Sequence, residues 1–400
     1  MHFSQWRRLL GVAAIAALTV AACGGGTATT APSAGTPSAA PSTGASGAPS
    51  SGTIDPAIDQ FPVKDNWKVG LSMSYFGNGW QTENQYAAQA LTGLGAYKDH
   101  VQLIVTQSGP DVQKQNAQIN QLIAQGVNAI IGFAISPDGL NNTVKAACDA
   151  GIAVVFYSGG STETCSHFVG VDYALQGKVM AEWLATAMNG KGNIFMNHGV
   201  AGTGPMVQRD QAAKAVFAKY PDLKVVAEVN GDWSAAVSQT QAAQALAAHP
   251  NIDGVWSEAG SDGVVRAMQA QGLKLVPTTG EGTNGWHRML VDKTLAAAGL
   301  TGMSTADASF DAPLALKLAV AQLEGYQIPS QYIIPVPTVY QQAPAQIDPG
   351  IAVSELKECT DIQAGCTVFP TGMFPDDYFV SFYFKGLPEL TLDSYVTGKP

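Results

Sequence analysis

Charged side chains are scarce in this 400-residue sequence. Asp, Glu, Lys and Arg make up 13% of it, and the formal net charge at pH 7 is −10. Binding to nucleic acid depends on Lys and Arg that neutralise phosphates, so this acidic balance argues against a nucleic-acid partner. The sequence also lacks the HExxH, P-loop, GxSxG and CxxC motifs. These absences predict a protein that is not an enzyme and that carries no cofactor.

Long apolar runs are also missing, with one exception near the amino terminus. Arg7 and Arg8 precede an apolar run over 9–22, and Cys23 follows it. The run is shorter than the ~20 residues of a membrane span, and its pattern is typical of a secretory signal. Residues 20–23, Val-Ala-Ala-Cys, resemble the lipobox of bacterial lipoproteins. The resemblance implies cleavage before Cys23 and lipid on that residue; the alternative is a plain signal peptide with an incidental Cys.

Residues 24–53 contain only Gly, Ala, Ser, Thr and Pro. A segment of this composition cannot bury apolar surface, so it is expected to stay disordered. We therefore predict a signal peptide over 1–22 and a lipidated Cys with a flexible linker over 23–55. The globular body would then be lipid-anchored at the extracytoplasmic face of the membrane, in the periplasm or at the cell surface.

Cysteine is the next scarce residue, with five in the chain. Once Cys23 is set aside as the lipid site, an even number remains, which in an exported protein predicts disulfides. Cys359 and Cys366 lie close together in a loop-rich tail, so pairing them is favoured, and elimination pairs Cys148 with Cys165. The spacings do not match a CxxC zinc site, so we expect no metal site.

From residue 67 onward, short apolar strands alternate with amphipathic helices, and this pattern occurs twice. The expected strands are 69–74, 101–106, 129–133, 152–156, 192–196, 223–229, 254–256 and 273–277. The expected helices are 81–97, 111–125, 141–150, 176–189, 205–220, 234–248, 262–271, 285–292 and 312–324. Continuous apolar strands between helices indicate parallel sheets covered on both faces, so the sequence predicts an α/β protein with two doubly wound lobes. Residues 345–400 are rich in Pro and aromatic residues, and we expect an irregular C-terminal extension there.

Several segments in this order resemble the type I periplasmic binding proteins of ABC importers, in particular the ribose/galactose-type sugar-binding group. They include the opening strand and turn over 69–81, Gln-Leu-Ile-Ala-Gln-Gly-Val-Asn-Ala-Ile-Ile over 121–131, and Gly-Val-Asp-Tyr-Ala-Leu-Gln-Gly over 170–177. Gly-Val-Ala-Gly-Thr-Gly over 199–204 and Ala-Ala-His-Pro-Asn-Ile-Asp-Gly-Val over 247–255 also match. The resemblance implies two lobes joined by a hinge of three segments. Lobe one would take 66–170 and 307–335, and lobe two 171–306 and 333–340.

Ligands of parallel sheets lie beyond the carboxyl ends of the strands, and the segments there hold few Lys or Arg and many Ser, Asn, Gly and aromatic residues. By resemblance, Trp80 and Trp233 would place opposing rings against a sugar, and Glu281 would accept its hydroxyls. Packing roles for both rings, and a solvated loop position for Glu281, are the alternatives. The complete predicted binding set is Ser74, Asn78, Trp80, Gln81, Ser158, Trp233, Glu258 and Glu281. Arg209 matches a family position that is more often structural than ligand-binding.

The resulting hypothesis is a monomeric lipoprotein that captures a sugar or sugar-like polyol between its lobes and delivers it to the permease of an ABC importer. Two departures from the family leave the ligand open: the stretch 157–159 lacks the family's Asp-Arg pair, and 258–262 replaces its Asn-Asp. One alternative is a receptor subunit for chemotaxis or for a sensor kinase. Another is an importer component for a nucleoside or an autoinducer-type furanose.

Overall fold

The chain divides into two units, Met1–Thr53 and Ile54–Pro400, and the fold below is that of the second. The computed structural model describes residues 55–57, 59–75, 78–307, 309–336, 338–341, 350–359, 367–370, 372, 374–379, 387 and 390–400. The predicted signal peptide, Cys23 and nearly all of the linker lie outside the described residues, as does Cys366.

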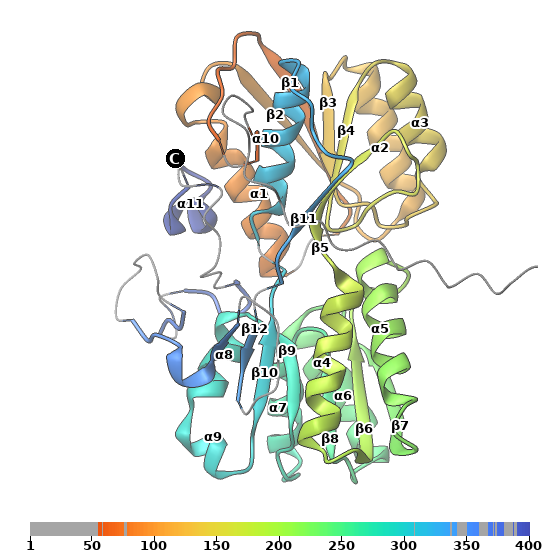
Figure 1. The fold of residues 1–400 in the computed structure, drawn as a ribbon, viewed down its shortest axis with the longest axis vertical. Helices are drawn as coiled ribbons and strands as arrows, with labels where there is room; N and C mark the ends of the chain where they lie inside the picture. Colours follow the sequence, from red (N-terminus) through yellow and green to blue (C-terminus); the bar gives the residue numbers. More distant parts are fainter. Residues whose placement is uncertain are drawn as a thin grey trace, which may run out of the picture. The chain divides into compact units, whose positions relative to one another are not determined.

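The first lobe contains a parallel sheet with the strand order β11-β5-β4-β3-β1-β2 (Figure 1). Its strands are β1 (Trp67–Met73), β2 (Val101–Gln107), β3 (Ala129–Gly132), β4 (Ala153–Tyr157), β5 (His167–Val171) and β11 (Gln331–Ile334). Its helices are α1 (Gly79–Leu91), α2 (Val112–Ala124), α3 (Asn141–Asp149) and α10 (Asp311–Leu323), with a 3-10 turn η1 (Gly95–Tyr97).

The second lobe contains a sheet with the order β13-β12-β10-β9-β8-β6-β7, parallel except where β12 meets β10. Its strands are β6 (Lys191–His198), β7 (Asp222–Asn230), β8 (Gly254–Ser257), β9 (Thr278–Glu281), β10 (Gly302–Thr305), β12 (Thr338–Tyr340) and β13 (Gly350–Ala352). Its helices are α4 (Tyr173–Ala187), α5 (Gly204–Phe217), α6 (Ala235–Ala248), α7 (Ser261–Ala270), α8 (Asn284–Val291) and α9 (Lys293–Ala297).

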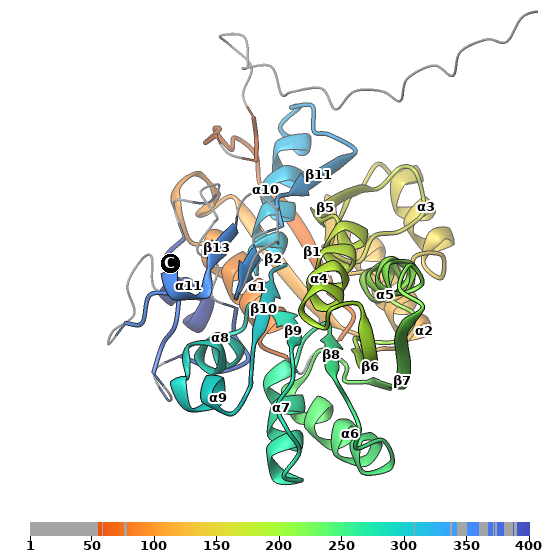
Figure 2. The same ribbon diagram turned by 60° about the horizontal axis from the view of Figure 1, so that its bottom comes forward.

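Both sheets are covered by helices on both faces, because successive side chains of a strand point to opposite faces. In β3, Ile131 packs into the core with α1 and α10, whereas Ile130 packs into the core with α2 and α3. In β6, Ile194 packs with α4 and α5, and Phe195 packs with α6 and α7. Figure 2 shows α4 and α5 on the opposite side of the second sheet from α6 and α7. The predicted α/β fold of two parallel-sheet lobes is confirmed.

The chain passes between the two sheets after β5, after β10 and after β11. Several helices of both lobes begin at residues whose side chains cap the first turn. Asn78 accepts from the N–H of Gln81 at the start of α1, and Asp172 accepts from Leu175 at the start of α4. These caps set where each helix starts at the carboxyl edge of its sheet.

Some predicted elements are wrong. Residues 273–277 are not a strand: Leu275 and Val276 are buried, but β9 begins only after Pro277, which has no N–H to donate to a neighbouring strand. The helix predicted over 81–97 ends at Leu91, because Gly93 and Gly95 interrupt it, and Gly95 has a φ of +46°. The sequence prediction also omits β5, β10, β11, β12 and β13, which are short or contain little apolar sequence.

The C-terminal extension contains the described elements β13, the 3-10 turn η2 (Val353–Glu355) and helix α11 (Leu392–Thr397). Strand β13 pairs with β12 of the second sheet, whereas α11 lies against α1 of the first lobe (Figure 1). Within the described residues, no helix combines the length and the apolar character needed to cross a membrane.

The predicted bond between Cys148 and Cys165 is present, with Cα atoms 6.4 Å apart. It ties the end of α3 to the loop that precedes β5. Cys359 is also disulfide-bonded, and its predicted partner, Cys366, lies outside the described residues.

Replacing both Cys148 and Cys165 with Ser should lower the free energy of unfolding. The two cysteines lie 17 residues apart along the chain. Closing a loop of this size in the unfolded state contributes about 3 kcal/mol to the free energy of unfolding. Urea unfolding without reductant measures the difference between the oxidised wild type and the double variant. Equal free energies would show that this disulfide does not stabilise the fold.

Candidate functional site

A cavity lies between the lobes at the carboxyl ends of both sheets, where ligands of parallel sheets bind. The lining residues come from loops and helix starts of both lobes and from the C-terminal extension: Tyr75, Asn78, Trp80, Phe133, Pro205, Arg209, Trp233, Glu281, Asp307 and Phe379. The cavity has a volume of about 20 Å³, counted as the space that the centre of a water molecule can reach. This is room for little more than one water molecule. The lobes are therefore shut around a nearly filled site.

Aromatic rings form one wall of this cavity. The Trp233 ring lies 5.7 Å from Tyr75 and 6.4 Å from Phe133 between ring centres, so lobe two packs directly on lobe one here. Trp80 lies 6.1 Å from Phe133. Each indole N–H has a partner, since Trp80 donates to the carbonyl of Asp307 and Trp233 donates to Glu258 Oε2 at 2.6 Å. Both rings are thus held in fixed orientations at the wall of the cavity.

The backbone that carries Trp233 is unusual. Asp232 and Trp233 have φ values of +51° and +53°, in the left-handed region that non-glycine residues rarely adopt. The indole packs against Gly199, where a Cβ would lie 2.0 Å from the ring. Only glycine at 199 leaves room for Trp233 in this position. The strained turn and this glycine together direct the ring toward lobe one.

Arg209 is the polar centre of the site. The guanidinium is 2% exposed and is paired with Glu258 through Nη1 at 3.3 Å and with Glu281 through Nη2. Its Nε donates to Gln176 Oε1 at 2.8 Å, and its Cζ lies 4.8 Å from the centre of the Tyr173 ring. A buried charge is tolerated because these partners replace its water shell. Helix α5 thereby holds a guanidinium at a fixed place beside the cavity.

A second group of acids lies where the chain returns to lobe one. Asp307 lines the cavity, and Asp311 lies behind it in the first turn of α10. Both accept from Ser158 Oγ, at 3.0 and 2.7 Å, and Tyr173 donates to Asp307. Ser158 reaches them from a left-handed turn after β4 with a φ of +58°. The hinge segments are thus connected by hydrogen bonds directly beneath the cavity.

The described acids of this site outnumber the single guanidinium, and their pKa values reflect this. Burial raises the pKa of Glu281 to about 7, although Arg209 opposes the shift. Burial also raises the pKa of Asp311 well above its ordinary value, and the neighbouring Asp307 adds to that rise. Burial raises the pKa of Glu258 in the same way, again against Arg209. With a pKa of about 7, Glu281 can donate as well as accept a hydrogen bond near neutral pH.

The eight predicted binding residues fall into two groups. Asn78, Trp80, Trp233 and Glu281 line the cavity. The other four are buried behind it: Ser74, Gln81, Ser158 and Glu258. Gln81 accepts from the hydroxyl of Tyr157, and Glu258 is bound to Arg209 and Trp233. None of these four side chains is among the lining residues of the cavity.

Six lining residues were absent from the predicted set, and one of them, Pro205, is the second residue of α5. Tyr75 and Phe133 directly follow β1 and β3, so the rule that ligands lie beyond strand ends could have identified them. Arg209 was expected to be structural, yet it both pairs with buried acids and borders the cavity. Asp307 follows β10, which the sequence prediction omits. Phe379 comes from the C-terminal extension, and no sequence signal connects it with the site.

One group of described residues has donor atoms close enough together to hold a metal ion: His198, Asp210 and Glu258, within 4.8 Å of one another. Most of their polar atoms are engaged, because His198 bonds Asp210 at 2.8 Å and Glu228 at 2.9 Å, and Glu258 Oε2 pairs with Arg209. The adjacent guanidinium would also repel a cation. We therefore assign no metal site there.

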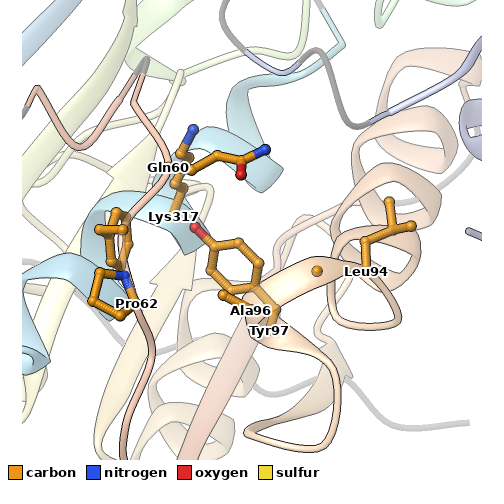
Figure 3. A pocket seen from close by; sticks show the side chains of 8 residues that line it. Gln60, Pro62, Leu94, Ala96, Tyr97 and Lys317 are labelled. Carbon is orange, nitrogen blue, oxygen red and sulfur yellow. The ribbon is translucent and has the colours of Figure 1, made fainter.

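A larger cavity lies in lobe one near the amino ends of β1 and β2, away from the strand ends that form the site. It leaves about 320 Å³ for the centre of a water-sized sphere. Figure 3 shows the residues around it: Gln60, Phe61, Pro62, Leu94, Gly95, Ala96, Tyr97 and Lys317. Lys317, on α10, is fully buried. None of these residues comes from lobe two, so this cavity does not lie between the lobes.

The raised pKa of Glu281 makes stability depend on pH. A carboxyl whose pKa is about 7 in the folded state and about 4.3 when unfolded stabilises the fold most below the unfolded value. That contribution is lost as the pH rises through 7. The free energy of unfolding of the wild type, relative to Glu281→Gln, should therefore fall from pH 5 to pH 8, by no more than about 1.4 kcal/mol per pH unit.

Urea unfolding of both proteins across this range measures the difference. Other titrating groups, such as His287, are present in both proteins, so their contribution to the pH dependence is removed by the comparison. If the two curves of unfolding free energy against pH run parallel, Glu281 is ionised in the folded state throughout this range.

Comparisons with known proteins agree with the two-lobed architecture. A family model described as a periplasmic binding protein domain matches residues 69–327. A xylitol-binding protein of Mycolicibacterium smegmatis is 28% identical over 243 residues, covering 59% of this chain and 68% of the relative. The ribose import binding protein RbsB of Escherichia coli is 26% identical over 240 residues, covering 55% and 80%.

Among solved structures, a Mycobacterium smegmatis protein in complex with β-D-fucofuranose superposes with a TM-score of 0.62 at 22% identity, covering 69% of this chain and 91% of that one. At this identity the likeness concerns the fold. The family model covers more than half of the chain, and its members bind solutes without chemically changing them. This chain therefore belongs to the periplasmic binding protein family, of the type I fold, and is not an enzyme.

Proposed function

We propose that this protein is an extracytoplasmic solute-binding protein that encloses a sugar or sugar-like polyol between its lobes and delivers it to an ABC importer. One observation carries the proposal: aromatic rings and a buried Arg–carboxylate group face the same cavity. Trp80 and Trp233 contribute the rings from the two lobes, and Arg209, Glu281 and Asp307 contribute the polar atoms.

This combination matches the chemistry of a sugar. Aromatic faces cover C–H patches, and planar charged groups hold hydroxyls in defined directions. Near neutral pH the site offers both donors and acceptors, because Arg209 donates and Glu281, with a pKa of about 7, can do either. The names of two relatives, a xylitol-binding and a ribose import binding protein, support the same class of solute.

Binding would require the lobes to open. The cavity leaves about 20 Å³, far less than a monosaccharide needs, and the Trp233 contacts with Tyr75 and Phe133 close it from the lobe-two side. A ligand that contacts both lobes shifts an open–closed equilibrium by its differential affinity for the two states. We also propose the lobe boundaries 66–170 with 307–335 and 171–306 with 333–340, which the crossings after β5 and β10 support.

A thermal-shift screen tests the proposed ligand class. Pentoses, hexoses, deoxysugars, polyols and nucleosides are added singly to the purified protein, and a bound solute raises the unfolding temperature by mass action. We expect a shift from at least one sugar or polyol. A shift from nucleosides alone would replace the sugar assignment, and no shift from any carbohydrate would contradict it.

Trp233→Ala should weaken binding of that solute by about 2 kcal/mol or more, as truncation of an aromatic anchor does. Isothermal titration calorimetry measures the change. Trp67→Ala is the matched control, because Trp67 lies at the amino end of β1, away from the cavity, and donates a hydrogen bond to Glu324. Gly199→Ala should also weaken binding by displacing the ring without removing it. An unchanged dissociation constant in Trp233→Ala would remove this residue from the site.

We further propose that Cys23 carries lipid and tethers the protein to the membrane, as the sequence 20–23 predicts. Cys23→Ser should then move the protein from the membrane fraction to the soluble fraction of cells that export it. Mass spectrometry of the wild-type amino terminus should show a diacylglyceryl adduct. Equal partitioning of the two proteins would favour a plain signal peptide.

A further inference from the structure

The C-terminal extension passes across the cavity from one lobe to the other. Its strand β13 belongs to the second sheet, and its helix α11 packs on α1 of the first lobe. Residues 376–379, called the clasp below, lie between the first turns of α1 and α8. These two helices belong to different lobes, so the clasp is a fourth place where the chain connects them, in addition to the three hinge crossings.

The clasp is bonded to lobe two through the start of α8. The N–H groups of Asn284 and Gly285 donate to the carbonyls of Tyr378 and Asp376, both at 2.8 Å. Phe379 forms an antiparallel bridge with Thr283. Arg288 Nη1 also lies 2.7 Å from Asp376 Oδ1. The first N–H groups of a helix have no partner within the helix, so the clasp supplies acceptors that α8 needs.

The same residues are bonded to lobe one through the start of α1. The N–H of Phe379 donates to Glu83 Oε2 at 2.8 Å, and Glu83 is 1% exposed. Gly79 packs so closely on the clasp that a Cβ there would lie 2.3 Å from the carbonyl oxygen of Asp377. These contacts hold only in the closed arrangement of the lobes, because one set must break when α1 and α8 move apart.

The side chain of Phe379 points into the cavity. It is 6% exposed and lines the same space as Trp80, Trp233 and Glu281. The preceding residue, Tyr378, is not among the lining residues and instead packs on Phe374. The match to the family model ends at residue 327, so this part of the wall lies outside the region that the family shares.

On the basis of the proposed function, we propose that Phe379 is a further ligand-contacting, specificity-determining residue and that the clasp holds the lobes together around the bound solute. A bound solute then contacts the phenyl ring, so Phe379 limits how large that solute can be. The clasp must leave one lobe before the solute can escape. Dissociation is therefore slowed by contacts that the solute itself does not make.

Phe379→Ala tests this inference, with Trp67→Ala as the control, because Trp67 lies at the amino end of β1, away from the clasp, and bonds Glu324. Stopped-flow Trp fluorescence measures dissociation of the sugar or polyol that binds most tightly in the screen. We expect dissociation about tenfold faster in Phe379→Ala, since affinity changes appear mainly in the off-rate, and about the wild-type rate in Trp67→Ala. Equal rates in all three proteins, alongside weakened binding in Trp233→Ala, would overturn the inference and leave the proposed function intact.

Two further measurements keep the test decisive. Without any solute, acrylamide should quench the Trp fluorescence of Phe379→Ala more than that of the wild type, because Trp80 and Trp233 lose their cover. If no sugar or polyol binds, the proposed function fails, and this quenching alone decides whether Phe379 closes the cavity. If Phe379→Ala does not fold, hydrogen exchange in the wild type decides: the amides of Asn284, Gly285 and Phe379 should exchange more slowly with solute, and unchanged exchange would overturn the inference.

Discussion

The buried guanidinium of Arg209 is the interaction on which the site depends. It lies between Glu258 and Glu281 and donates to Gln176, so it connects α5 with β9, the loop after β8, and α4. Two acids with little exposure, Glu258 and Glu281, pair with this one cation. Burying such a charge without its partners would cost several kcal/mol. The lobe-two elements must therefore meet in this arrangement, in which Arg209 opposes the rise that burial causes in the pKa values of both carboxyl groups.

The aromatic wall depends in turn on this polar network. Glu258, held by Arg209, accepts the Trp233 N–H, and the carbonyl of Asp307 accepts the Trp80 N–H. The rings that would cover a solute are therefore oriented by groups that also carry or neighbour the buried charge. Gly199 completes this arrangement, because any side chain there would occupy the space of the Trp233 ring. The polar network and the aromatic rings thus hold each other in position, and a substitution in either would displace the other.

Local sequence patterns predicted the architecture well where strands are apolar and helices are capped. Strands such as β3 and β4 are continuous apolar runs, and α2 begins after Asp111, whose carboxylate accepts from the first turn. The prediction failed where pairing partners, and not composition, make the strand. In β9, Thr-Thr-Gly-Glu has little strand character of its own and becomes a strand because it pairs with β10. Whether such a segment becomes a strand is decided by the strands beside it in the sheet.

The amino-acid sequence by itself determined the two parallel-sheet lobes, the loops that would face the cleft and the Cys148–Cys165 pair, because apolar periodicity and cysteine number are local or countable features. Only the tertiary structure decided which polar residues face the cavity and which support it. Ser74 and Glu258 follow strands as Trp233 does, and Gln81 lies in the first turn of α1, yet none of the three lines the cavity. The sequence pattern gave no indication that Phe379 lines the cavity, because Phe379 is placed there by a contact between segments nearly three hundred residues apart. No local pattern encodes such a distance.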